Sequence, residues 1–473
     1  MQNIYRSIYL MSSLLLLLTG CKKFDGSENV DPNRPSKASG TQLIASAERS
    51  LPDMSSSPFG VHYPQHLSNT SFTDNSRYTT IYFNFYGWYT GPLQDLESVF
   101  TSTLDANEGP IVNQVAVAKI LKAYIFWFVT DRWGDVPYSE SLKGRNNFTP
   151  KYDKQKDIYD SLFLLLDQAN ASIVTGNIKN DIMYNGDVTK WKKFGNTIHM
   201  LMGLRLSKVD PVKGALEFNK AVTNGIMTSN ADNFAYSHLA DAANENFWYT
   251  QMNRLGRLWY AVSKPLVDTL LSTNDPRLPI FANKATSGAN SGTYAGLPYG
   301  LTSTVTPGNY SLLGDTLRLQ NAPVYLVTYP QALFALAEAA KTGWIAGGDV
   351  TAKTNYDLAI QNSVLQWTKR TTGVTALLAQ PSVAYNPATA LKQIAVQRWI
   401  HLFLNGYEAW AEWRRTGFPV LIAAPGANGD KIPRREAYPV IERSNNTINY
   451  NAAVAAFPYG GADDLNTRVW WDR

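Results

Sequence analysis

The chain has 473 residues and carries 43 Lys and Arg against 38 Asp and Glu, a formal net charge of +5. This small and dispersed excess excludes the basic footprint of a nucleic-acid-binding protein. Aromatic residues make up 12% of the chain and charged residues only 17%, below the ~25% that is usual in globular domains. Many aromatic rings among few charges suit a surface that stacks on uncharged polar ligands.

The N-terminal residues predict export. Arg6 precedes an apolar run over residues 8–18, which is too short to span a bilayer and is typical of a secretory signal peptide. The run ends in Leu18-Thr19-Gly20-Cys21, a pattern that resembles the lipobox of bacterial lipoprotein signals. We expect residues 1–20 to be removed and Cys21 to be acylated and to anchor the chain. An ordinary signal peptide followed by a chance cysteine is the alternative. Cys21 is the only cysteine, so disulfides are excluded.

A linker and a folded body are expected after the anchor. Residues 21–40 are polar and contain two prolines, which is typical of a lipidated linker. No later apolar run reaches the length that spans a bilayer. We therefore predict that residues 41–473 form a single domain, tethered to the membrane by its N-terminus.

Helical periodicity dominates this body and predicts an all-α fold. In chain order, the strongest segments are residues 42–51, 111–129, 158–171, 191–206, 211–223, 258–271, 330–342, 355–369 and 389–414. The two helices on either side of Gly347-Gly348 look like one helix–turn–helix unit of the tetratricopeptide type. No clean repeat of about 34 residues runs through the chain, so periodicity supports only degenerate repeats.

Two long stretches lack helical periodicity. Residues 273–324 are rich in Gly, Ser, Thr, Asn and Pro, and residues 416–473 form a second irregular region. Long irregular loops on a rigid helical frame commonly carry binding sites. We expect long irregular loops to form the ligand-binding face.

The sequence favours binding over catalysis, because the usual hydrolase, nucleotide and dinucleotide motifs are missing from it. His62 and His66 have the spacing of metal ligands, but Pro64 between them argues against a helical zinc site. Glu408 and Glu412 share one helix face. We interpret them as charge partners of the arginines that follow, on a partly solvated face, and not as glycosidase carboxylates. We therefore predict no enzyme, no metal and no cofactor.

Three stretches carry distinctive motifs. The first covers residues 118–140 and includes Thr130-Asp131-Arg132-Trp133-Gly134-Asp135-Val136-Pro137-Tyr138. The second covers residues 405–419 and includes Asn405-Gly406-Tyr407-Glu408-Ala409-Trp410. The third joins Ile432-Pro433-Arg434-Arg435 to the C-terminal Val469-Trp470-Trp471-Asp472. In this order they resemble the SusD/RagB family of nutrient-binding outer-membrane lipoproteins, and in particular its SusD-like subgroup.

The resemblance implies a fold, a location and a partner. The fold would be an all-α body with about four tetratricopeptide-like helical pairs and an irregular region that carries the ligand surface. The location would be the outer membrane, with the body facing the cell exterior. The partner would be a SusC-like TonB-dependent transporter. Binding residues differ between members of this family, so none can be carried over by motif.

Candidate binding residues therefore follow from chemistry alone. Exposed aromatic rings stack on sugar C–H faces or on apolar peptide side chains, and Asn, Gln, Asp and Arg bind the polar groups. Residues 63–88 and 244–259 combine both features, and loop residue Tyr299 belongs to a weaker third group. The candidates are Tyr63, Gln65, Asn69, Asp74, Arg77, Tyr78, Tyr82, Trp88, Asn246, Trp248, Tyr249, Arg254, Trp259 and Tyr299. Packing in the core is the alternative for each ring taken singly.

Together with these patterns, the resemblance implies a cell-surface lipoprotein that captures oligosaccharide and delivers it to its transporter. The same role with oligopeptide ligands stays open, since the sequence does not decide between the two. A surface glycosidase would instead require two carboxylates about 5–9.5 Å apart in a cleft.

Overall fold

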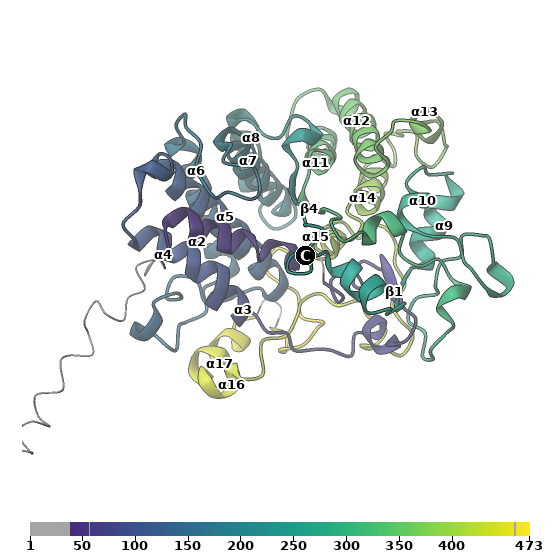
Figure 1. The fold of residues 1–473 in the computed structure, drawn as a ribbon, viewed down its shortest axis with the longest axis horizontal. Coiled ribbons are helices and arrows are strands. Elements are labelled where there is room, and N and C mark those ends of the chain that lie inside the picture. The colour runs from purple at the N-terminus through teal and green to yellow at the C-terminus, as the bar shows by residue number, and fades with distance from the viewer. Residues whose placement is uncertain (1–37, 56, 458–459) are drawn as a thin grey trace, which may run out of the picture. The chain divides into compact units, whose positions relative to one another are not determined.

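The computed structural model describes residues 38–55, 57–457 and 460–473, and Gly40–Arg473 form one compact unit. The predicted signal peptide, the lipidated Cys21 and nearly all of the linker lie outside the described residues. What is described is mostly helical, so the all-α prediction is confirmed (Figure 1).

The longest helices pack against their neighbours in the chain as consecutive pairs. The pairs are α5 (Ile111–Trp133) with α6 (Gln155–Ser172), α7 (Val188–Arg205) with α8 (Pro211–Asn224), α11 (Tyr329–Lys341) with α12 (Gly348–Thr368), and α14 (Ala390–His401) with α15 (Gly406–Thr416). In Figure 1 they follow one another across the ribbon from α6 to α14. The helix–turn–helix unit predicted around Gly347-Gly348 is confirmed. Both glycines have positive φ, +99° and +52°, a conformation that glycine adopts without strain.

The other helices are short. The α-helices are α2 (Gly40–Glu48), α3 (Tyr86–Trp88), α4 (Gln94–Thr101), α9 (Lys264–Ser272), α10 (Leu278–Phe281), α13 (Val374–Leu378), α16 (Glu442–Asn445) and α17 (Thr447–Ala455). The 3₁₀ turns are η2 (Leu51–Met54), η3 (Thr73–Arg77), η5 (Ala106–Glu108), η6 (Gly144–Asn146), η7 (Asn230–Asp232), η9 (Gly288–Asn290), η10 (Pro307–Asn309) and η11 (Asp315–Arg318), and the π turns are η4 (Tyr89–Leu93) and η8 (Tyr249–Arg254). Short elements therefore interrupt both stretches that were predicted to be irregular.

Short antiparallel strands join distant parts of the chain. β1 (Leu67–Asn69) pairs with β3 (Tyr260–Val262), and β2 (Phe234–Tyr236) pairs with β4 (Val324–Val327). The predicted helix over residues 258–271 is therefore wrong in its first part. α9 starts only after β3, where Pro265 suits the first turn of a helix.

The predicted helix over residues 389–414 is wrong in its middle. α14 ends at His401 and α15 begins at Gly406. Between them Leu404 has φ +67°, a left-handed conformation that interrupts the helix. Asn405 then donates its side-chain N–H to the Leu326 carbonyl at 2.8 Å. The break is held by a contact with a distant strand, which helical periodicity does not reveal.

Buried ion pairs join the helical pairs at the centre of the domain. Arg205 from α7 donates to Glu408 and to Glu412 of α15, each at 2.6 Å. Glu412 also pairs with Arg398 and Arg415. These acidic groups are nearly buried, so a partly solvated face is the wrong interpretation for them. Burial raises the pKa of Glu408 to about 7. Burial also opposes ionisation of Glu412, but its guanidinium partners outweigh this effect and lower its pKa.

Among the described residues, α5 is the one helix long and apolar enough to span a membrane by length and composition. Within its most apolar window, 67% of the residues are buried inside the domain. It packs against α6 and α4 as the central core helix of the N-terminal half.

Candidate ligand-binding face

Strand pairing brings the two predicted binding segments together. Ser68 of β1 lies opposite Ala261 of β3. The pairing continues past the strands, where the Thr70 backbone N–H donates to the Trp259 carbonyl at 2.8 Å. The Thr70 hydroxyl donates to the Leu258 carbonyl at 2.9 Å. Residues 63–88 and 244–259 therefore meet along one edge, although they are far apart in the sequence.

Two aromatic rings reach the surface at this edge. Phe72 is 53% exposed, and its ring meets that of half-buried Trp259 edge to face, with centroids 4.6 Å apart. The Arg257 guanidinium lies over the Trp259 ring, 4.8 Å from its centroid. We call Phe72, Arg257 and Trp259 the aromatic platform. Apolar rings beside a hydrogen-bond donor are the combination that a neutral polar ring ligand requires.

A tight turn after β1 holds Phe72 at the surface. The Asn69 side-chain oxygen accepts hydrogen bonds from the backbone N–H groups of Ser71 at 3.0 Å and Phe72 at 2.7 Å. Such side-chain-to-backbone bonds stabilise turns. Tyr78 closes the following η3 turn with φ +59°. Because Asn69 and Tyr78 are buried, the turn is anchored from inside, and Phe72 is presented without any need for the backbone to reorganise.

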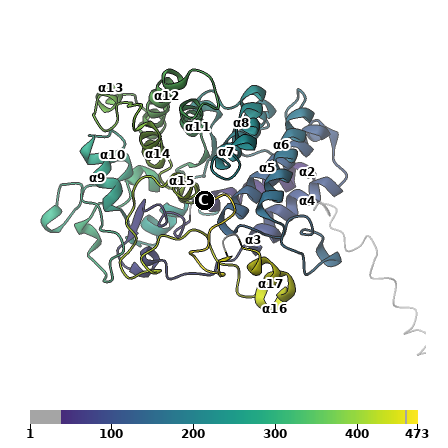
Figure 2. The ribbon, with the colours of Figure 1, turned by 180° about the vertical axis from the view of Figure 1, so that it is seen from behind.

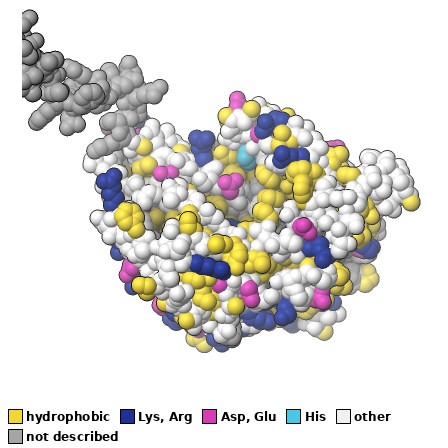
Figure 3. All heavy atoms as spheres, turned by 90° about the horizontal axis from the view of Figure 1, so that it is seen from below, with side chains coloured by type: hydrophobic (Ala, Val, Ile, Leu, Met, Phe, Trp, Pro, Cys, Tyr) yellow, Lys and Arg dark blue, Asp and Glu magenta, His cyan; other side chains and the backbone are white. Residues whose placement is uncertain are grey.

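Arg77 ties both irregular regions to this turn. One of its terminal nitrogens donates to the Gly300 carbonyl at 3.1 Å and to the Pro425 carbonyl at 3.0 Å. The Tyr299 hydroxyl donates to the His62 carbonyl at 2.5 Å. Loops from residues 273–324 and 416–473 thus both reach the segment that carries Phe72. Figure 3 shows a face seen from below Figure 1, hollowed near its middle, with hydrophobic side chains gathered in a broken band across it.

Several predicted binding residues are buried, namely Tyr63, Gln65, Asn69, Tyr78, Asn246 and Trp248. The Tyr63 hydroxyl donates to Glu436 at 3.3 Å, and the Asn246 amide donates to the Ala322 carbonyl at 3.0 Å. Burial raises the pKa of Tyr78 to about 12. These side chains support the fold from inside. Their contact with a ligand stays a prediction.

The remaining predicted residues reach the surface to different degrees. Asp74, Tyr82 and Arg254 are exposed, whereas Arg77, Trp88, Tyr249, Trp259 and Tyr299 are half-buried. Trp88 packs edge-on against Phe128, with centroids 5.1 Å apart, and Arg254 pairs with Glu245 at 2.5 Å. Tyr82 stacks under the Arg443 guanidinium, 4.8 Å from the ring centroid. Of the predicted rings, Tyr82 and Trp259 are therefore the ones best placed to meet a ligand.

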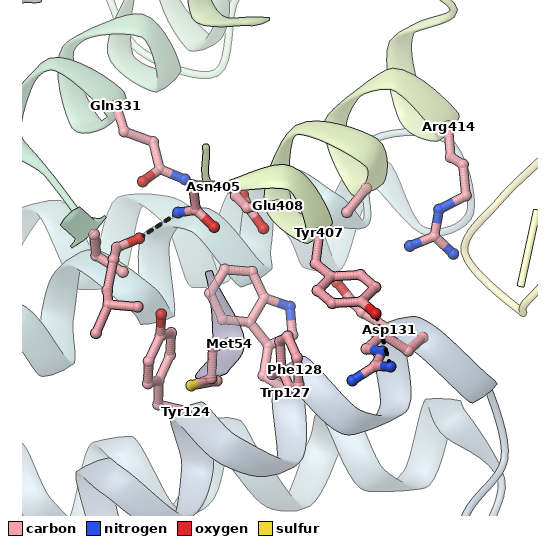
Figure 4. Close-up of a pocket in the computed structure, with 14 residues that line it drawn as sticks. Met54, Tyr124, Trp127, Phe128, Asp131, Gln331, Asn405, Tyr407, Glu408 and Arg414 are labelled. Carbon is pink, nitrogen blue, oxygen red and sulfur yellow. Dashed lines mark hydrogen bonds between the residues drawn. The ribbon is translucent and has the colours of Figure 1, made fainter. Parts of the chain in front are cut away.

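An internal cavity of about 30 Å³ lies at the centre of the domain (Figure 4). Gln331, Asn405 and Glu408 line it together with Arg414. Arg414 stacks on the rings of Trp410 and Trp471, at 3.6 and 4.6 Å from their centroids. Of the two arginines predicted as charge partners, Arg415 is the one that pairs with Glu412. Because one water molecule needs about 10–15 Å³ of such cavity space, the cavity has room for only a few water molecules. A sugar or a peptide does not fit there.

The histidines with metal-ligand spacing bond to the main chain. His62 Nδ1 lies 3.0 Å from the Leu67 carbonyl oxygen, and His66 Nε2 lies 3.0 Å from that of Trp399. Burial lowers the pKa of His62 to about 4 and that of His66 to about 3, so both rings are neutral at neutral pH. Within the part of the chain that the structure describes, no group of three or more His, Cys, Asp or Glu could hold a metal ion.

Phe72 and Arg257 are platform residues that the sequence analysis did not single out. Phe72 is an isolated large apolar residue between Ser71 and Thr73, followed by Asp74. A phenylalanine in such a polar run gains little from local burial, and this is the signal that would have identified it. Arg257 stands two residues before the predicted Trp259, but only the folded chain shows that the two stack.

Comparison with known proteins places the chain among binding proteins of the outer membrane. Residues 32–439 match the model of the SusD-like_2 family, described as starch-binding and associating with the outer membrane. A solved structure named as a chitin-binding protein is 30% identical, with TM-score 0.79 over 91% of this chain and 98% of that chain.

Two further solved structures share the fold. A SusD homologue from Bacteroides fragilis NCTC 9343 is 25% identical, with TM-score 0.80 over 92% of this chain and 100% of that chain. A chitin-binding SusD homologue from Flavobacterium johnsoniae is 23% identical, with TM-score 0.78 over 92% of this chain and 98% of that chain, and supports the fold alone. No curated protein sequence matches the chain.

Proposed function

Because this chain belongs to the SusD-like family, we propose that it captures oligosaccharide at the cell surface and delivers it to a SusC-like TonB-dependent transporter. The family description supports carbohydrate as the nutrient and the outer membrane as the location. Delivery and the transporter partner go beyond that description. Binding without catalysis is part of the proposal, since the family is described by what it binds.

The ligand class that we favour is an oligomer of N-acetylglucosamine, the sugar of chitin. The structure that is 30% identical to this chain is named as a chitin-binding protein. N-acetylglucosamine is uncharged and offers an apolar ring face, an acetyl methyl group and hydrogen-bonding oxygens. The aromatic platform has groups that complement each of these, because Phe72 and Trp259 present rings and Arg257 presents N–H donors.

The exposed Phe72–Trp259 pair is the observation that carries the proposal. Covering apolar surface stabilises by roughly 25 cal/mol per Å², and a well-placed aromatic contact adds about 0.5–1.5 kcal/mol beyond burial. The part of an aromatic ring that stays exposed contributes little to folding, whereas covering it with a ligand contributes to binding. The anchored turn at Asn69 reduces the ordering cost that a mobile ring would impose on binding.

We propose that a lipid anchor holds this domain at a membrane. In the proposal, residues 1–20 are removed, acylated Cys21 anchors the chain, and residues 21–40 link the anchor to the domain over residues 41–473. Two or three acyl chains on one residue hold a protein firmly, since each buried methylene contributes ~0.8 kcal/mol. A body tethered in this way would stay beside its transporter.

The experiment is a calorimetric titration of the full-length lipoprotein in detergent with chitin, starch and peptide oligomers. Saturable binding of N-acetylglucosamine oligomers without product formation is expected. Trp259→Ala should weaken it about tenfold, whereas Leu216→Ala, at an exposed position on α8, should not. Peptide binding alone would transfer the role to oligopeptides, and released sugar would contradict the absence of catalysis. Unchanged affinity in Trp259→Ala would reject the platform.

A further inference from the structure

A groove separate from the aromatic platform lies beside α3. It has a volume of about 370 Å³ and runs between the α3–η4 turn, the loop over residues 137–150, and α16. Its walls carry the aromatic rings of Tyr86, Tyr89 and Phe148. Figures 1 and 2 show α3 beside α16 and α17, and Figure 1 shows this group of helices well separated from β1. Phe148 is 79% exposed, a large ring that contributes almost nothing to the core.

A buried carboxylate lies in the wall of this groove. Glu442 is only 4% exposed and accepts hydrogen bonds from the hydroxyls of Tyr86 and Tyr152. The Asn446 amide lies 3.4 Å from the same carboxylate. Burial and the Glu442 charge raise the pKa of both tyrosines, so both hydroxyls stay protonated as donors. Glu442 is therefore held in place by neutral groups.

Glu442 has no cationic partner of its own. Within the described residues, 38–55, 57–457 and 460–473, no lysine, arginine or histidine forms an ion pair with Glu442. The adjacent Arg443 donates instead to Tyr82 at 2.8 Å and to Tyr450 at 3.1 Å. Lys154 pairs with Asp135 at 2.9 Å. Buried acidic side chains are nearly always paired with a cation or hydrogen-bonded, and Glu442 has hydrogen bonds but no cation. Its negative charge is therefore not neutralised by a neighbouring side chain and would favour a cation in the adjoining groove.

The other residues that line the groove indicate which kind of cation it would bind. Apart from Glu442, the charged group among the groove's lining residues is Lys143, which is exposed. The polar lining groups are uncharged amides and hydroxyls, including Gln94, Asn147 and Asn445. A lysine side chain from a peptide offers only the donors of its ammonium group, whereas the hydroxyls of a sugar ring can both donate to and accept from groups of this kind. The groove is also much larger than an ammonium group alone requires.

We infer that this groove binds a protonated amino sugar, the glucosamine unit that results when an N-acetylglucosamine oligomer loses an acetyl group. Its ammonium group would lie against Tyr86, Tyr89 and Phe148 and be attracted by Glu442, since cations bind aromatic faces. Its hydroxyls would bond to the amides of the wall. The choice of sugar rests on the proposed glycan-binding function, and the groove adds a preference for partly deacetylated chains that the platform does not provide.

The test compares fully acetylated and fully deacetylated glucosamine oligomers by calorimetry on the full-length lipoprotein in detergent. Glu442→Gln keeps the shape and an acceptor oxygen but removes the charge. It should weaken binding of the deacetylated oligomer by about tenfold or more. Affinity for the acetylated oligomer is measured in parallel, because it reports on the platform.

Phe148→Ala is a second test in case Glu442→Gln fails to fold. This variant should fold, since the exposed ring does not support the core. It should lower the affinity for the deacetylated oligomer about threefold to tenfold. Leu216→Ala, at an exposed position on α8, should leave that affinity unchanged. Lys143→Ala should raise the affinity for the deacetylated oligomer a few-fold, because the variant removes a positive charge that repels the ammonium group of the ligand.

Each outcome separates the two proposals. Unchanged affinity for the deacetylated oligomer in both Glu442→Gln and Phe148→Ala would overturn the inference, even where acetylated oligomers bind at the platform. A second outcome is that both variants lose binding of the deacetylated oligomer and the wild-type protein does not bind acetylated oligomers. That outcome would support the groove as an amino-sugar site and reject the chitin assignment of the platform. Equal or tighter binding of a lysine-containing peptide, sensitive to Glu442→Gln, would overturn the amino-sugar identity.

Discussion

Trp248 and Trp259 lie eleven positions apart in one predicted binding segment and are expected to respond to mutation in opposite ways. Trp248 is 2% exposed and packs against Tyr260, with centroids 5.1 Å apart. It borders an internal void of about 20 Å³, which has no room for a sugar. A buried tryptophan removes about 150–250 Å² from water, worth about 4–6 kcal/mol at 25 cal/mol per Å². With partial collapse of the cavity, Trp248→Ala should lower the free energy of unfolding by about 3–5 kcal/mol.

Trp259→Ala removes a half-buried ring that contacts the rings of Phe72 and Tyr260. Its loss should lower the free energy of unfolding by about 1 kcal/mol, because much of its surface is already in contact with water. Affinity for the glycan should instead fall about tenfold, which corresponds to about 1.4 kcal/mol. Trp248→Ala should leave the affinity of the folded fraction unchanged.

Guanidinium unfolding followed by circular dichroism gives the stabilities, and calorimetric titration at a temperature where both variants are folded gives the affinities. Unfolding of Trp248→Ala at the wild-type midpoint would contradict this prediction, because the ring would then not be part of the core. Loss of glycan binding in Trp248→Ala while it stays folded would also contradict it, since the site would then include the buried segment.

Three further outcomes follow from named contacts. Burial raises the pKa of Glu408 to about 7, above the ~4.3 of a glutamate in an unfolded chain. The protonated side chain therefore stabilises the folded state fully below about pH 4, and this stability is lost as the pH rises through about 7. Glu408→Gln should flatten this decline in urea-unfolding free energy between about pH 5 and pH 8, and an unchanged slope would contradict the assignment. Arg77→Ala should lower the free energy of unfolding by about 1–3 kcal/mol, because it loses its bonds to the Gly300 and Pro425 carbonyls; a change as small as that of an exposed residue would show that these loops are held in another way. Cys21→Ala should abolish incorporation of labelled palmitate and move the protein from the membrane to the soluble fraction, and persistence in the membrane would disprove the lipid anchor.

Regular helices were predictable because helical periodicity is a local property of the sequence. Apolar residues repeated every three or four positions over residues 111–129, 158–171 and 211–223, and these segments lie within α5, α6 and α8. The glycine pair at the turn between α11 and α12 was recognisable for the same reason. Motifs that resemble the SusD-like family lie in these helices and in the buried turns between them, so the family was also identifiable before the fold.

Contacts between distant residues decided the places where this reasoning failed. The start of the predicted helix over residues 258–271 is strand β3, because β1 offers its backbone groups to residues that would otherwise bond within a helix. The helix over residues 389–414 breaks where Asn405 bonds to Leu326. Glu408 and Glu412 are buried because α7, which is far away in the sequence, brings Arg205 to both of them.

By itself, the sequence determined the class of protein, the positions of most long helices and the segments rich in aromatic and amide side chains. It did not determine which of those side chains face a ligand. Tyr63, Trp248 and Trp259 are chemically alike, but only the tertiary structure buries the first two and leaves the third half-exposed beside Phe72. The physical reason is that the free energy of burying a ring depends on the surfaces that close around it. Glu442 is the clearest case, because the two tyrosines that hold it lie 356 and 290 residues earlier in the sequence, and most of the groove that it faces comes from the same distant part of the chain.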